Sequence, residues 1–100
     1  MGHAVIFSAQ AGRDLEAIVS FIARHNPAAA ERLGNSLVDR ALMLGKLPRL
    51  GAPVSRRPGV CRFVQKPWVV IYYQIEASPD VVEILRFWDA RQDPGTLRLS

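Results

Sequence analysis

Val60-Cys-Arg-Phe-Val-Gln65 begins the part of the chain that decides its fold, and Trp68-Val-Val-Ile-Tyr-Tyr-Gln-Ile75 and Val81-Val-Glu-Ile-Leu-Arg-Phe-Trp88 complete it. All three runs are rich in β-branched and aromatic residues, which favour strands. The breaks between them, residues 66–67 and 76–80, are short and contain proline. Because short breaks join antiparallel neighbours, the pattern predicts a three-stranded antiparallel meander.

The chain before this meander begins with a short strand and then changes its period. Residues 4–7 form an apolar run suited to a strand, and Ser8 follows as a candidate helix N-cap. From Ala9 onward, apolar residues recur at helical spacing. The change of period predicts an amphipathic helix directly after the first strand.

A second helix follows after a very short break. Asn26 is a candidate N-cap, and Pro27 suits the first helical position. Gly45 and Pro48 are expected to end this helix. Two amphipathic helices joined in this way form an antiparallel hairpin whose apolar stripes need a sheet to cover them. We therefore predict a single α+β domain over residues 1–100: an N-terminal strand, the helical hairpin and the meander, forming one small sheet with the helices packed on one face.

The charge of the chain points to an anionic partner. The 100 residues carry 13 basic and 9 acidic side chains, a formal charge of +4, and 49% are hydrophobic, as in one globular domain. Eleven of the basic residues are arginines. A guanidinium binds carboxylate or phosphate through two parallel hydrogen bonds, which an ammonium does not. The segment 45–62 holds five cations and no acid.

Several classes of protein are excluded by what the sequence lacks. Cys61 is the only cysteine, so neither an intramolecular disulfide nor a cysteine-based metal site forms. No phosphate-binding loop or metal-ligand spacing occurs, and we expect neither a metal nor a cofactor. The sequence shows no signal peptide and no apolar run near the roughly 20 residues that span a membrane. We expect a cytoplasmic protein that does not bind membranes.

Five stretches in a fixed order are spread over nearly the whole chain: residues 7–22, residues 26–30, Leu47-Pro-Arg-Leu-Gly51, Val69-Val-Ile-Tyr-Tyr73 and Ile84-Leu-Arg-Phe-Trp-Asp-Ala-Arg-Gln-Asp-Pro94. Together they resemble the RelE/ParE superfamily of toxins from bacterial type II toxin–antitoxin modules. The similarity is greatest to ParE-like members, which are also labelled plasmid stabilisation proteins.

This resemblance implies a toxin that a cognate, ParD-like antitoxin holds inactive in a hetero-oligomer. ParE-like members poison DNA gyrase and are not known to need an active site. RelE-like members are ribosome-dependent endoribonucleases that cut mRNA in the A site. A third possibility is a non-toxic relative that only binds a partner. Direct binding of nucleic acid is left open.

The residues available for catalysis favour the gyrase reading. Ribonuclease chemistry of the RelE type needs a base, an acid and cations around the phosphate. RelE-like nucleases typically add a C-terminal aromatic residue or histidine near the sheet edge. Here no tyrosine or histidine occurs after Trp88, and the two histidines, His3 and His25, come early. We therefore assign no catalytic residue.

The candidate contact residues fall into two groups. Contact with the target is expected of three arginines and two supporting side chains: Arg62, Arg86, Arg91, Trp88 and Asp93. Contact with the antitoxin is expected of the basic loop after the second helix: Arg49, Arg56 and Arg57. For three residues of the first group, a purely structural role is the alternative. Arg86 would bond to a strand end or to Asp89, Arg91 would pair with Asp93, and Trp88 would cover the core.

Overall fold

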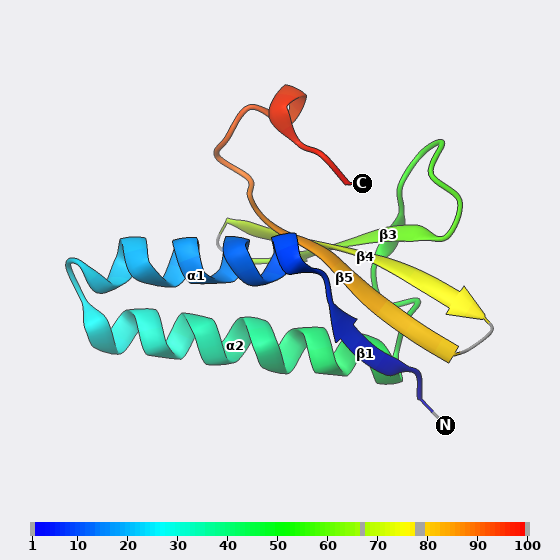
Figure 1. Ribbon diagram of the computed structural model, residues 1–100, viewed down its shortest axis with the longest axis horizontal. Coiled ribbons are helices and arrows are strands. Elements are labelled where there is room, and N and C mark those ends of the chain that lie inside the picture. The colour runs from blue at the N-terminus through cyan, green and yellow to red at the C-terminus, as the bar shows by residue number, and fades with distance from the viewer. Residues whose placement is uncertain (1, 67, 78–79, 100) are drawn as a thin grey trace.

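The computed structural model describes residues 2–66, 68–77 and 80–99. The protein folds into a five-stranded sheet with two helices on one face (Figure 1). The strand order is β1-β5-β4-β3-β2, with β1 parallel to β5 and all other neighbours antiparallel. This mixed sheet confirms the predicted α+β fold. In chain order the elements are β1 (Ala4–Phe7), α1 (Ala9–Ala23), α2 (Pro27–Lys46), β2 (Ala52–Pro53), β3 (Val60–Gln65), β4 (Val69–Ala77), β5 (Asp80–Asp89) and a short 3-10 helix, η1 (Pro94–Thr96).

Both helices begin at the capping residues that the sequence predicts. The Ser8 hydroxyl accepts a hydrogen bond from the amide of Ala11 at 3.0 Å, and the Asn26 side chain accepts one from the amide of Ala29 at 3.0 Å. These bonds satisfy amide groups that have no partner within the helix. Within the described residues, neither helix is long and apolar enough to cross a lipid bilayer.

The end of α2 lies between the two predicted stop residues, Gly45 and Pro48, but Gly45 is part of the helix and not its stop. The helix continues to Lys46, and Gly45 is buried against β1. A Cβ atom at this position would overlap the side chain of Val5 and lie 2.8 Å from the carbonyl oxygen of His3. The amide of His3 donates to the carbonyl of Gly45 at 2.6 Å. The glycine therefore lets β1 approach the helix closely. In the sequence, a glycine with this role cannot be told apart from a glycine that ends a helix.

The basic segment after α2, expected to be irregular, contains the two-residue strand β2 and is fixed from within the sheet. The fully buried Tyr73 donates its hydroxyl proton to the carbonyl of Pro48 at 2.7 Å and accepts the amide of Gly51 at 2.9 Å. Burial raises the pKa of Tyr73 to about 12. One core side chain thus holds the turn that leads into the basic loop.

A β-bulge in β5 sets which side chains reach the core. Tyr73 pairs with Ile84 but Tyr72 pairs with Arg86, so Leu85 is an extra residue in β5. After the bulge, Phe87 faces the helices. The core beneath the helices comprises Ile18, Leu37, Leu44, Ile71, Tyr73, Val82, Ile84 and Phe87, among others.

The start of α1 takes over as the neighbour of β5 where β1 ends. The amide of Ser8 donates to the carbonyl of Ile84 at 2.9 Å, and its hydroxyl donates to the carbonyl of Leu85 at 2.9 Å. One turn further on, the Asp14 carboxylate accepts the amide of Phe87 at 3.1 Å. Polar groups of the helix therefore satisfy the strand edge that β1 leaves open.

Candidate functional site

The sheet face opposite the helices carries three of the five predicted target-contact residues. Arg62 of β3 pairs with Tyr72 of β4, and Tyr72 pairs with Arg86 of β5, so the three form one row across the sheet. Strand spacing places the two arginine backbones about 10 Å apart. Trp88 lies on the same face, paired with Val70. The C-terminal segment passes over this face (Figure 1).

The guanidinium of Arg86 is bound to Asp14, not to Asp89 as the structural alternative had it. Its Nε and Nη2 atoms donate to the two carboxylate oxygens of Asp14 at 2.6 and 3.0 Å, and the side chains are only 13% and 10% exposed. Nη1 donates to the carbonyl of Arg98 at 2.8 Å. Arg86 therefore joins α1, β5 and the C-terminal segment, and its charge is matched within the fold.

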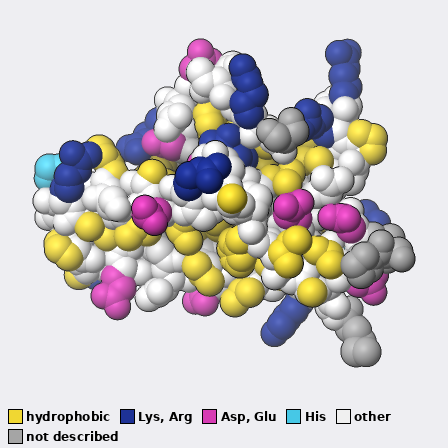
Figure 2. Space-filling view, viewed as in Figure 1, with side chains coloured by type: hydrophobic (Ala, Val, Ile, Leu, Met, Phe, Trp, Pro, Cys, Tyr) yellow, Lys and Arg dark blue, Asp and Glu magenta, His cyan; other side chains and the backbone are white. Residues whose placement is uncertain are grey.

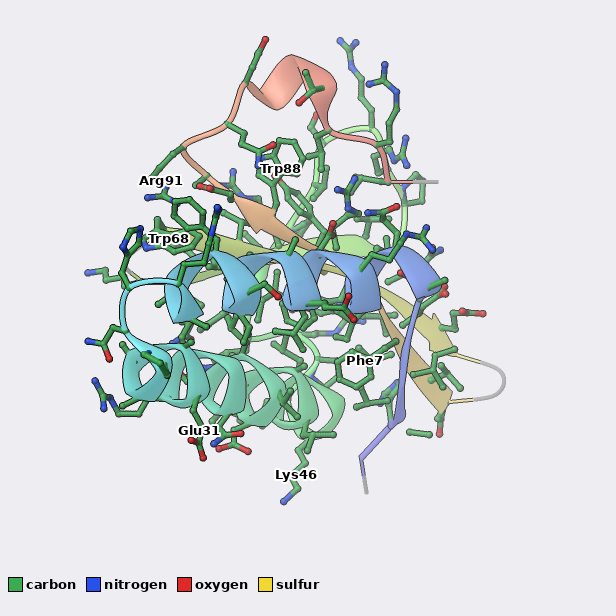
Figure 3. All side chains as sticks on the ribbon, turned by 60° about the vertical axis from the view of Figure 1, so that its left-hand side comes forward. Phe7, Glu31, Lys46, Trp68, Trp88 and Arg91 are labelled. Atoms are coloured by element: carbon green, nitrogen blue, oxygen red, sulfur yellow. The ribbon has the colours of Figure 1, made fainter. Side chains whose placement is uncertain are left out.

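Arg91 also has its carboxylate partner within the chain. Its Nε and Nη2 atoms donate to Asp89 at 2.9 Å each, and these hydrogen bonds lower the pKa of Asp89. The guanidinium lies 3.9 Å from the ring centre of Trp68 (Figure 3). The predicted pair of Arg91 with Asp93 is wrong, because Asp93 instead accepts the amide of Gly95 at 2.9 Å in the turn before η1.

The arginines of the basic loop have no carboxylate partner within the described residues. Within the described residues, the two salt bridges are those of Arg86 and Arg91, and all four loop and strand arginines, Arg49, Arg56, Arg57 and Arg62, are exposed. Three of them, Arg49, Arg56 and Arg57, line a groove of about 480 Å³ beside β3. The basic side chains stand out from the surface near this loop (Figure 2).

Large apolar side chains are exposed along β1 and the end of α2. They form what we call the apolar surface: Ile6, Phe7, Leu42, Met43, Leu47 and Leu50, each 36–54% exposed. Figure 2 shows hydrophobic side chains spread over this side of the molecule. So many exposed apolar groups on one small domain indicate a surface that a partner covers.

Sequence reasoning missed the carboxylate and aromatic partners of the predicted residues. Asp14 binds Arg86, Trp68 lies under Arg91, and Tyr72 stands between two arginines of the sheet. Strand alternation indicated that one of the two neighbouring tyrosines faces outward, which was the available signal for Tyr72. Within the described residues, no three histidine, cysteine or acidic side chains meet in a way that could hold a metal ion.

The short strand, the helical hairpin and the arginine-bearing sheet agree with the resemblance to toxins of the RelE/ParE superfamily. Residues 5–94 match the family model of the ParE toxin of the type II toxin–antitoxin system parDE, and the chain belongs to that family. Among curated proteins, none matches the chain.

Two solved structures share the fold. A chain of the chromosomal ParDE toxin–antitoxin system from P. aeruginosa superimposes with a TM-score of 0.73 at 21% identity, over 87% of this chain and 95% of that one. A chain of the RelBE2 toxin–antitoxin complex from Mycobacterium tuberculosis superimposes with a TM-score of 0.66 at 25% identity, over 89% of this chain and 99% of that one. The fold is thus common to structures named for both branches of the superfamily.

Proposed function

We propose that this protein inhibits DNA gyrase through protein contacts and is neutralised by direct binding of a ParD-like antitoxin. The observation that carries the proposal is the match to the ParE toxin family over residues 5–94. The ion pairs of Arg86 and Arg91 agree with it, because guanidinium groups already bound to carboxylates are poorly placed to stabilise a reacting phosphate. Gyrase works in the cytoplasm, so the proposal places the protein there.

The chemistry of the predicted contact residues also favours binding over catalysis. Arginine stays charged at every relevant pH and does not relay protons. The segment after Trp88 contains no tyrosine or histidine that could serve as a base near the sheet. A surface of this composition holds carboxylates or phosphates without turning them over.

The antitoxin is proposed to cover the apolar surface and to reach the basic loop. A disordered antitoxin segment that folds on binding would lay an apolar helix on the helical hairpin. Acidic residues of the same segment would then meet Arg49, Arg56 and Arg57, which lack carboxylate partners within the described residues. The two solved relatives come from toxin–antitoxin systems, which supports a partner of this kind.

The decisive test places the purified toxin in two assays. In the first, DNA gyrase acts on relaxed plasmid, and we expect the toxin to block supercoiling. In the second, ribosomes translate a reporter message, and we expect the message to stay intact. Cleavage of the message in the A site with undisturbed supercoiling would overturn the proposal. Normal growth of cells that express the toxin without antitoxin would instead indicate a non-toxic binding protein.

One observation supports ribosome-dependent mRNA cleavage as a second candidate. Tyr72 stands between Arg62 and Arg86 in the same row, and a phenol flanked by guanidinium groups is a possible acid or base for phosphodiester cleavage. The salt bridge between Arg86 and Asp14 weighs against mRNA cleavage, because it already engages one of the two guanidinium groups beside Tyr72. If message cleavage is found, Tyr72→Phe should abolish it while antitoxin binding persists.

A further inference from the structure

A groove of about 310 Å³ lies between α1 and the C-terminal end of β5, away from α2. We call it the α1–β5 groove. Its walls are formed chiefly by Ala17, Ile18, Phe21, Trp68, Asp89 and Arg91. Its volume is at the lower end of the range of about 300–1,000 Å³ found for binding pockets, and it has room for one or two inserted side chains.

Helical spacing places one line of α1 residues along this groove. Asp14, Ala17, Phe21 and Arg24 follow one another at intervals of three and four. Asp14 forms a salt bridge with Arg86, whereas the side chain of Phe21, almost two turns further along α1, is 49% exposed. The apolar part of this line is therefore open to solvent beside β5, whereas other residues of α1 face α2 and the core.

Two aromatic rings of the groove each have a guanidinium beside them. Arg91 lies 3.9 Å from the ring centre of Trp68, and Arg24 lies 5.2 Å from that of Phe21. Arginine and aromatic residues are enriched at protein–protein interfaces and supply most of the side chains that dominate binding energy. The combination indicates a protein-binding surface.

The cation of this surface is held in place before any partner arrives. Nε and Nη2 of Arg91 are fixed by Asp89, whereas Nη1 donates to no group within the described residues. Arg24 likewise forms no salt bridge there. Donors that are oriented in advance lose little entropy on binding, so Nη1 of Arg91 offers a preset hydrogen bond, while the charge of Arg24, which no carboxylate matches within the described residues, attracts a carboxylate.

We propose that the α1–β5 groove is the surface that contacts gyrase, where it takes an apolar side chain of the enzyme flanked by a carboxylate. The apolar side chain would lie between Phe21 and Trp68, the carboxylate would meet Arg24, and Nη1 of Arg91 would donate a hydrogen bond to a polar group of the same segment. This inference rests on the proposed function. It separates the target surface from the apolar surface and basic loop that the antitoxin is proposed to cover.

The test compares three variants of the full chain in the supercoiling assay. Phe21→Ala removes the exposed wall and should raise the toxin concentration for half inhibition by roughly tenfold or more, as for a dominant interface side chain. Arg91→Lys keeps the charge but loses the planar stack and the fork of hydrogen bonds, so it should also weaken inhibition. Val64→Ala is the matched control, since Val64 of β3 is 51% exposed and lies outside the groove.

Each outcome decides one claim. If the wild type inhibits gyrase and only the groove variants lose inhibition while antitoxin affinity and thermal midpoint stay unchanged, the groove is the target surface. If the wild type inhibits and Phe21→Ala inhibits equally, the groove assignment fails and the proposed function stands. Loss of antitoxin affinity in Phe21→Ala would reassign the groove to the antitoxin. A wild type that leaves gyrase unaffected overturns both.

Discussion

The carboxylate of Asp14 makes most of its contacts with residues that are far away in the sequence. It accepts both Nε and Nη2 of Arg86, the amide of Phe87 and the side-chain amide of Gln10. Because Asp14 and Arg86 lie 72 residues apart, the sequence shows two unrelated charges. The pair ties the helical hairpin to the sheet next to the predicted target-contact residues.

Removing one partner of this pair should destabilise the fold. Asp14→Asn leaves the Arg86 guanidinium, with 13% of its side chain exposed, facing a neutral amide. We expect the free energy of unfolding to fall by about 2–3 kcal/mol, somewhat less than for a fully buried pair. Urea denaturation measures this loss. Asp89→Asn is the control, since its partner Arg91 has 55% of its side chain exposed, solvent screens the pair, and the loss of stability should be clearly smaller.

A double replacement separates structural from functional roles of Arg86. Asp14→Leu with Arg86→Met substitutes an apolar contact for the ion pair and should recover part of the lost stability, while the amide of Phe87 remains without its acceptor. If this folded variant still arrests growth, Arg86 acts through the fold alone. Loss of toxicity with intact antitoxin binding would show that the guanidinium itself contacts the target.

The hydroxyl of Tyr73 makes stability sensitive to alkaline pH. The pKa is about 12 in the folded chain against 10.0 for an unburied tyrosine. Unfolding therefore releases a proton between these two values, so this contribution to stability is complete below about pH 10 and is lost as pH rises toward 12. Tyr73→Phe should lower the free energy of unfolding at neutral pH by about 1–2 kcal/mol, because the groups of Pro48 and Gly51 lose their partner.

Urea denaturation at about pH 9 and about pH 11 checks this prediction. The wild type should lose stability between the two conditions, and Tyr73→Phe should lose less. Equal losses in both proteins would show that other groups govern the alkaline response.

At the scale of elements, the sequence predicted what is local and missed what is long-range. Both caps, the first strand and the bounds of β3 follow from turn residues and periodicity. The bulge at Leu85 leaves no mark in the sequence, because an extra residue in a strand looks like any other. The strand β2 has two residues, too few for any pattern. Trp68 and Arg91 meet only because the β4–β5 pairing aligns their strand ends.

Two of the three α-helical glycines, Gly45 and Gly12, should respond in opposite ways to alanine. Gly45→Ala places a methyl group against Val5 and the carbonyl of His3, so β1 must move and stability should fall by about 1–3 kcal/mol. Gly12→Ala meets nothing within 4 Å and should stabilise α1 by up to about 1 kcal/mol. Thermal denaturation of the two variants compares them directly. A gain in stability for both would mean that β1 accommodates the methyl group.

The basic loop should control the rate of antitoxin binding. Arg56→Glu with Arg57→Glu should slow association with the antitoxin and reduce the dependence of its rate on salt, because both side chains are exposed at the groove beside β3. Surface plasmon resonance at low and moderate ionic strength measures both effects. Arg13→Glu with Arg98→Glu changes the net charge equally on another surface and serves as the control. Unchanged association at low salt would show that the loop faces away from the antitoxin.

At the scale of the whole molecule, the two layers share one core and should unfold together. The core draws on both helices and on β3, β4 and β5, so neither layer retains a buried surface without the other. We expect one cooperative transition for residues 1–100. Far-ultraviolet circular dichroism reports the helices, and tryptophan fluorescence reports Trp68 and Trp88 at the sheet. Midpoints in urea that differ between the two signals would show that the layers unfold separately.

The pairing of β1 with β5 has a consequence for folding during synthesis on the ribosome. Translation produces β1 before the other four strands of this sheet, yet its neighbour is β5, the last of the five. Ser8 and Leu85, which bond to each other, are separated by 77 residues of synthesis. While those residues are being added, α1 has no strand edge to lie along and the α1–β5 groove does not exist. A nascent chain on the ribosome therefore lacks the proposed target surface until β5 has emerged.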